Sequence, residues 1–162
     1  ENSTHGNKNP VLIVISGTSC QTTRGGKMAF ALDDRAPLGV TEIVSLVRKA
    51  VEMGAPSVQL VLLGCLTDSL AVAITGELSK LGVKKLPNST VVYATGPFAD
   101  ERATLVLSDM HNARPSNPME WNKVLGRLNK ILASSLADAN ISSIFDEDVE
   151  YGALFQCANL FP

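Results

Sequence analysis

The stretch SVQLVLLGCLTDSLAVA, residues 57–73, decides the fold of this chain. Its first eight residues, 57–64, form a nearly continuous apolar run, which is typical of a strand buried on both faces. Asp68 then offers a favourable N-cap for a helix that is predicted to run to about Leu81. A buried strand followed directly by a helix indicates a parallel α/β unit.

Further strands and helices are predicted on both sides of this unit. Residues 10–16, PVLIVIS, form a second apolar run and are predicted to be a buried strand. Apolar residues recur at helical spacing over 41–53, and Gly54 stands where a helix usually ends. A third strand is predicted at 89–96 and a fourth at 103–109. Strands and helices therefore alternate along the chain.

The sequence from Asn117 onwards predicts another helix. Asn117 can cap it, Pro118 suits its first position, and Glu120 can complete a capping box. The apolar residues that follow at helical spacing predict its buried face: Trp121, Leu125, Leu128 and Leu132. The predicted fold class is α/β, a three-layer sandwich with a mainly parallel central sheet.

One folded domain is expected. Of the 162 residues, 45 % are hydrophobic and 19 % charged, which is typical of a globular chain with a real core. The polar residues 1–9 are predicted to be a disordered lead-in, and residues 10–135 the domain. The acidic, weakly periodic residues 136–162 are predicted to be a tail that packs on the domain or on a partner.

Composition narrows the possible partners. The net charge of −2 and the absence of a basic block argue against nucleic acid. No apolar run is long enough for a membrane span. Glycine-rich phosphate motifs and metal-ligand spacings are absent, so no cofactor or metal is expected. The three scattered cysteines slightly favour an intracellular compartment, whereas the Asn-x-Ser/Thr triplets at Asn2, Asn88 and Asn140 point towards secretion, so the compartment stays open.

The candidate site lies where the predicted strands end. Open α/β sheets place their sites outside the carboxyl ends of the strands. Cys65 follows a buried strand and precedes a helix, whose dipole favours a thiolate, so it is the candidate nucleophile. His111 is the candidate base, although a lone loop histidine is more often simply solvated, just as a lone cysteine is more often packed in a core. Other residues are expected at the same edge: Ser16, Gly17, Gly64 and Asp68.

The order of these segments resembles a CHAT domain, a member of the caspase-like, separase-related cysteine peptidases. The resemblance rests on VLIVISG, GKMAFALDDRAPLGVTEIVSLV, VQLVLLGCLTDSLA and VVYATGPFADERATLVL, and it covers roughly residues 10–135. It implies a caspase-like α/β fold in which Cys65 matches the nucleophile. It also implies that Gly64 lies where the family uses backbone amides to bind the oxyanion.

The sequence departs from this family at the base. The family places its catalytic histidine directly before a glycine, and this chain has Ser16 before Gly17. A serine hydroxyl cannot accept a proton near neutral pH as an imidazole does. The resemblance therefore implies a degenerate domain that binds a protein partner or a larger assembly. The alternative is an active cysteine peptidase in which Cys65 uses a relocated base such as His111.

Two further interpretations remain open. VQLVLLGCLTDSLAVAITGEL followed by STVVYATG is similar to the small subunits of proteasome assembly chaperones, which implies a small α/β assembly factor. In that case Cys65 would only pack. The third interpretation is a small-molecule enzyme that uses the hydroxyls at the strand ends, although the sequence supplies no evident base or metal ligands for it.

Overall fold

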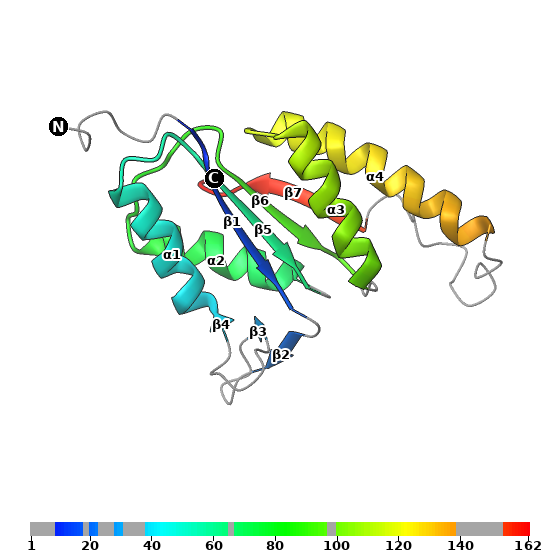
Figure 1. Cartoon of the computed structure of the whole chain (residues 1–162). Coiled ribbons are helices and arrows are strands. Elements are labelled where there is room, and N and C mark those ends of the chain that lie inside the picture. The colour runs from blue at the N-terminus through cyan, green and yellow to red at the C-terminus, as the bar shows by residue number, and fades with distance from the viewer. Residues whose placement is uncertain are drawn as a thin grey trace.

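A four-stranded sheet with helices on both faces organises the protein (Figure 1). The computed structural model describes residues 9–17, 20–22, 28–30, 38–64, 67–96, 100–138 and 154–162. The α/β class and the mainly parallel sheet are confirmed. In chain order the elements are β1 (Val11–Ser16), β2 (Cys20–Thr22), β3 (Met28–Phe30), β4 (Leu38–Gly39), α1 (Val40–Glu52), β5 (Val58–Leu63), α2 (Asp68–Lys80), β6 (Thr90–Ala94), α3 (Asp100–Ala113), α4 (Pro118–Asp138) and β7 (Phe155–Asn159).

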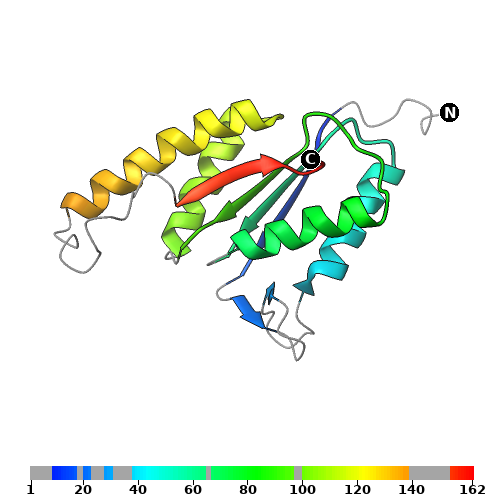
Figure 2. The ribbon, with the colours of Figure 1, turned by 180° about the vertical axis from the view of Figure 1, so that it is seen from behind.

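The strand order in the main sheet is β1-β5-β6-β7. β1 is parallel to β5, with Val11 opposite Val58, and β5 is parallel to β6, with Gln59 opposite Thr90. β7 returns antiparallel to β6, beside which it runs in Figure 2. The short strands β2, β3 and β4 form a separate antiparallel sheet. All six residues of β5 are buried, as the apolar run predicts for a central strand.

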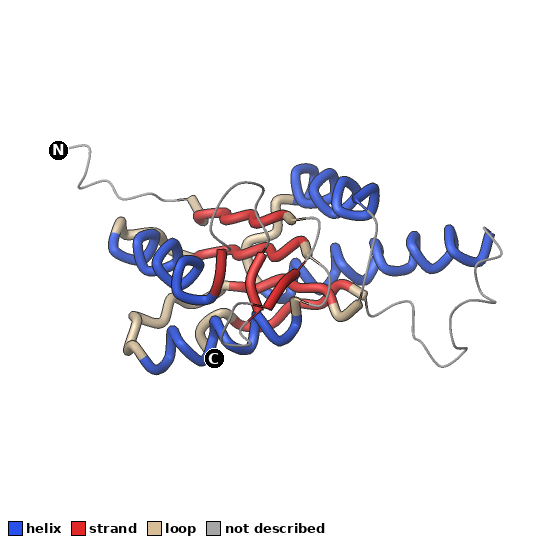
Figure 3. The backbone as a smooth tube through the Cα atoms, turned by 90° about the horizontal axis from the view of Figure 1, so that it is seen from below, coloured by secondary structure: helices blue, strands red, loops and turns tan. Residues whose placement is uncertain are grey.

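The helices α1 and α2 cover one face of the main sheet, and α3 and α4 cover the other (Figure 3). Side chains alternate along each strand, so the two faces build separate apolar clusters. The first cluster includes Ile43, Val47, Leu60, Leu70 and Ile74. The second includes Val61, Val92, Val106, Trp121 and Leu128. The structure thus has a helical layer on each side of the sheet.

The first two predicted helices are confirmed, with two differences of detail. Glu42 accepts a hydrogen bond from the Gly39 N–H at 2.9 Å, which satisfies a free donor at the start of α1. Gly54, just beyond the helix, adopts φ +83°, a left-handed conformation that favours glycine. Leu46, one of the apolar residues at helical spacing within 41–53, is 42 % exposed rather than buried. The N-cap of α2 is Thr67 rather than Asp68, which is the first residue of the helix.

The strand predicted at 103–109 is wrong, because these residues belong to α3. Val106 and Met110 are buried four residues apart, which is the spacing of one helix face. The run Thr104 to Leu107 is rich in strand-forming residues, and a short apolar run cannot by itself distinguish a strand from a helix. His111 consequently lies in the last turn of a helix rather than in a loop after a strand.

The helix predicted from Asn117 is confirmed as α4. Asn117 Oδ1 accepts the Glu120 N–H at 2.9 Å, as expected of an N-cap. Glu120 does not close the predicted capping box, since its carboxylate accepts the N–H of Ser116 at 2.9 Å and the Ser116 hydroxyl at 3.2 Å. Trp121, Leu125 and Leu128 are buried on one face, as predicted.

The two edges of the sheet differ from the expectation. β1 was expected to be buried on both faces, but it is an edge strand whose exposure alternates, with Leu12 and Val14 partly in solvent. At the other edge, Phe155–Asn159 forms β7, a strand that the sequence analysis did not predict within residues 136–162. Residues 1–8, most of the expected lead-in, lie outside the described residues.

Candidate functional site

Thr67 joins the carboxyl ends of the two central strands. Its hydroxyl donates to the Leu62 carbonyl of β5 at 3.3 Å and accepts the Ala94 N–H of β6 at 2.9 Å. The residue is fully buried. Because the hydroxyl is used between strands, it makes no side-chain bond to the start of α2. The sequence analysis missed this role, since a threonine before a helix suggests a cap and nothing local identifies its partners.

Several of the predicted site residues do meet at this edge. Gly17 donates its N–H to the Leu63 carbonyl at 3.1 Å, which extends the pairing of β1 with β5 beyond the last strand residue. Gly64 is buried, and Ser16 is exposed. Ser16, Gly17 and Gly64 therefore lie together, as expected for residues that follow adjacent parallel strands.

Cys65 lies outside the described residues. The candidate nucleophile therefore stays a prediction from sequence. Its described neighbours in the chain are Gly64, which directly follows β5, and Thr67, the N-cap directly before α2.

Asp68 lines a hollow between α2 and the strands β6 and β7. The hollow has a volume of about 340 Å³, and Asp68, Val72, Tyr93 and Asn159 are among its lining residues. Burial, together with the charges of Cys157 and Asp68, raises the pKa of Tyr93 above its ordinary value. Tyr93 donates weakly to Gln156 Oε1 at 3.4 Å. Asp68 is exposed, so it can act on this hollow only as a solvated carboxylate.

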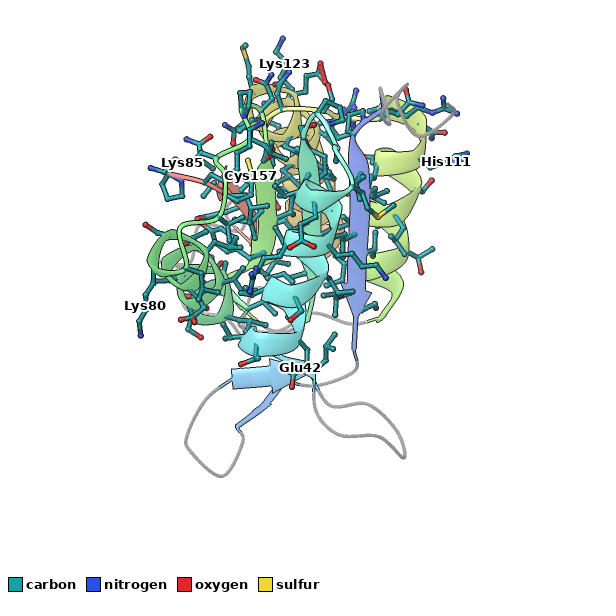
Figure 4. The ribbon with its side chains drawn as sticks, turned by 90° about the vertical axis from the view of Figure 1, so that its left-hand side faces the viewer. Glu42, Lys80, Lys85, His111, Lys123 and Cys157 are labelled. Carbon is teal, nitrogen blue, oxygen red and sulfur yellow. The ribbon has the colours of Figure 1, made fainter. Side chains whose placement is uncertain are left out.

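His111 lies at the opposite end of the sheet from Gly64. It lines a groove with Asn9 and Pro10, which precede β1, and with Ser116, which precedes α4. In Figure 4 the β1 arrow points away from His111 and towards Glu42 at the start of α1. The structure therefore does not bring His111 to the carboxyl edge with Ser16 and Gly64, and His111 is not available as a base there.

Cys157 is the thiol whose surroundings the structure describes. It lies on β7, with Sγ 3.2 Å from Asn122 Oδ1 and 3.6 Å from the Pro118 carbonyl oxygen of α4. Burial raises the pKa of Cys157 from 9.0 to about 11. A raised pKa keeps the thiol protonated, so Cys157 is a weak nucleophile at neutral pH.

The described part of the chain holds neither a metal-binding cluster nor a membrane-spanning helix. Its His, Cys, Asp and Glu side chains include no group of three placed to hold a metal ion. Among the same residues, no helix combines the length and apolar character needed to cross a membrane.

The arrangement defines a class of fold, an α/β protein with a mainly parallel sheet and a candidate site at its carboxyl edge. No family model, curated protein or solved structure was found to match the chain.

Proposed function

We propose that this chain is a degenerate caspase-like domain that acts as a protein-binding module and not as a peptidase. The order of elements supports the proposal. A parallel strand ending at Ser16-Gly17 is followed by a short antiparallel hairpin, a helix and a second parallel strand ending at Gly64. This is the order that the CHAT resemblance implies.

The inference that the domain lacks peptidase activity rests on one observation, the missing catalytic base. The position that should hold the catalytic base is Ser16, and the described imidazole, His111, lies at the other end of the strands. A catalytic base must come within about 3.2 Å of its nucleophile, directly or through one water. Without such a base, a thiol with the ordinary pKa of about 8.5 is a poor peptidase nucleophile.

The reactivity of Cys65 tests this proposal. In a Cys20→Ser, Cys157→Ser background, alkylation of Cys65 by iodoacetamide is measured from pH 5.5 to 9.5. We expect the rate to rise with pH through the ordinary thiol range, and we expect no cleavage of peptide substrates. The matched variant Ser16→His supplies an imidazole at the family's position, and it is expected to raise the alkylation rate below pH 7.

Two results would overturn the proposal. One is rapid alkylation below pH 7 with Ser16 in place, which would show an activated thiolate. The other is peptide cleavage that is lost in Cys65→Ala. If Ser16→His leaves the rate unchanged across the pH range, the caspase-like part of the proposal fails, because its base position would not face the thiol.

A further inference from the structure

The two edge strands of the main sheet, β7 and β1, differ in whether another part of the fold covers their outer side. At β7, the buried side chain of Asn129 on α4 bonds both the N–H and the carbonyl of Phe155. A side-chain amide thus occupies part of the edge that a further strand would need. Among the described residues, β1 pairs only with β5, so its outer side has no such cover. Within the described part of the chain, the outer edge of β1 is therefore open to a further strand.

The backbone of β1 presents pairing groups to the outside. The Val11 N–H bonds the Ser57 carbonyl at 3.0 Å, and the Gly17 N–H bonds the Leu63 carbonyl at 3.1 Å. In a parallel ladder, alternate residues bond the same neighbouring strand. Val11 and Gly17 belong to the set of alternate residues that bond β5. The other set directs its N–H and C=O groups to the open side: Leu12, Val14 and Ser16.

The side chains of β1 also lack the usual protection of an edge. Natural edge strands carry charges, prolines or bulges that prevent pairing with other chains. Val11–Ser16 contains no charged residue and no proline. Leu12 is 49 % exposed and Val14 37 % exposed, on the face opposite to the α1 and α2 layer. An uncharged, partly apolar edge strand is suited to accept another strand.

A groove at the amino end of β1 indicates what kind of strand fits. It has a volume of about 430 Å³ and an apolar floor that includes Leu12 and Met110. Its rim carries Arg114 and His111 at the end of α3, and no acidic residue is among its described lining residues. The nearby Glu120 carboxylate is already bonded to Ser116. The groove is therefore complementary to a carboxylate attached to an extended chain.

The backbone at Arg114 supports a role for its side chain. Arg114 adopts φ +46°, a conformation that glycine takes without steric cost and that other residues adopt only with backbone strain. Its N–H caps α3 by bonding the Met110 carbonyl at 2.8 Å. A glycine would serve this cap better, so the cap does not explain an arginine here.

We propose that β1 is a docking strand for an extended segment of a partner protein, and that Arg114 and His111 bind an acidic side chain or a terminal carboxylate of that segment. This rests on the proposed binding function and names its surface and the chemistry of its partner. Segments of about five residues are long enough to pair with the three outward-facing residues of β1.

An immobilised library of synthetic octapeptides, probed with the purified full chain, tests the docking strand. We expect bound peptides to share alternating β-branched residues and at least one Asp, Glu or free terminal carboxylate. Arg114→Glu is expected to reverse this preference towards Lys and Arg. Arg114→Gly, which relieves the left-handed backbone, should weaken binding about tenfold without lowering the melting temperature.

Val14→Pro isolates the backbone contribution. The N–H of Val14 faces the open side of β1. Proline at this position should therefore be tolerated in the fold but should abolish pairing of β1 with a bound peptide. If this variant does not fold, peptides N-methylated on the pairing side replace it, and they should lose binding to the unaltered chain. Peptide binding that survives both changes, binding insensitive to Arg114→Glu, or no enrichment at all would overturn the proposal. A chain dimer in light scattering that Val14→Pro dissolves would also overturn it, by identifying a second copy as the occupant.

The failure of this inference is distinguishable from that of the proposed function. An active peptidase would be revealed at Cys65 whether or not β1 binds peptides. Conversely, a chain without peptidase activity that binds no peptide at β1 would refute only the docking strand.

Discussion

Asn129 and Phe155 exchange two hydrogen bonds across 26 residues of sequence: Asn129 Nδ2 donates to the Phe155 carbonyl at 2.9 Å, and the Phe155 N–H donates to Asn129 Oδ1 at 3.2 Å. Both residues are buried, with Asn129 only 3 % exposed. The side-chain amide of Asn129 thus pairs with the strand as a backbone amide would. It joins α4 to the outer edge of β7 and reduces the room for another strand there.

Replacing Asn129 with alanine is expected to destabilise the fold by about 2–4 kcal/mol, because two buried backbone groups of Phe155 lose their partner. Urea unfolding measured by circular dichroism gives the free energy of unfolding. Lys123→Ala is the matched control, since Lys123 is exposed on the same helix, and it should change that free energy by less than about 0.5 kcal/mol. Equal effects of the two substitutions would contradict the pairing.

Gln59 is expected to be a second polar residue on which the fold depends. Its Oε1 accepts the Trp121 Nε1–H at 2.8 Å, and its Nε2 donates to the carbonyls of Asn88 at 2.9 Å and Ser116 at 3.0 Å. Gln59→Leu removes the partner of the buried Trp121 Nε1–H and of the part-buried carbonyls of Asn88 and Ser116, so a loss of about 2–4 kcal/mol is expected. Fluorescence of Trp121, the single tryptophan, reports both the altered environment and the unfolding transition.

The half-buried Gln156 on β7 provides the comparison for Gln59. Its one described side-chain bond, from Tyr93, is long at 3.4 Å. Gln156→Leu should therefore cost less than about 1 kcal/mol and leave the Trp121 emission unchanged. If Gln59→Leu were as mild as Gln156→Leu, the central role of Gln59 would be refuted.

Two glycines are expected to respond to alanine with opposite signs. Gly54 has φ +83°, so Gly54→Ala should destabilise the fold by about 1 kcal/mol although its added Cβ would meet nothing within 4 Å. Gly76 lies inside α2, where the added Cβ also meets nothing, and Gly76→Ala should stabilise by about 0.5–1 kcal/mol. Thermal unfolding of both variants tests the pair, and shifts of the same sign would contradict these helix boundaries.

Stability is expected to fall in alkali partly through Cys157. Burial raises the pKa of its thiol to about 11 in the folded chain, so the folded state holds this proton more tightly than the unfolded state, where the thiol is solvated. The resulting stabilisation is complete below pH 9 and is lost as the pH rises towards about 11. Urea unfolding of Cys157→Ala under reducing conditions should show a shallower decline over this interval.

Tyr93 also lowers the stability of the fold as the pH rises into the alkaline range, because burial raises the pKa of its hydroxyl in the folded chain. The comparison is therefore made in a Tyr93→Phe background. Identical pH profiles with and without Cys157 would show that its thiol titrates alike in the folded and unfolded chain.

The local elements of this fold could be predicted from sequence. The six buried residues of β5, the helix ending before Gly54 and the N-cap at Asn117 were all predictable, because composition, spacing and capping act within a few residues. α3 could not be predicted, since its apolar residues are too few to distinguish helical spacing from strand alternation.

The candidate site was predictable in position but not in composition. Ser16, Gly17 and Gly64 meet because they follow adjacent parallel strands, a consequence of topology that sequence order already indicates. The bridging role of Thr67 depends on carbonyl and amide groups from two strands, and the position of His111 depends on the length and direction of α3. Neither dependence can be seen in a local pattern.

The sequence by itself determined the α/β class, the central strand and the absence of an imidazole before Gly17, because these depend on residue identity and short-range periodicity. Only the tertiary structure decided which strands stand at the edges. β1 is as apolar as β5, and the difference in their exposure arises from non-local pairing and from where the helices pack. The packing of α4 places Asn129 at the edge of β7. The pairing of β1 with β5 leaves the backbone N–H and C=O groups of Leu12, Val14 and Ser16 directed outwards.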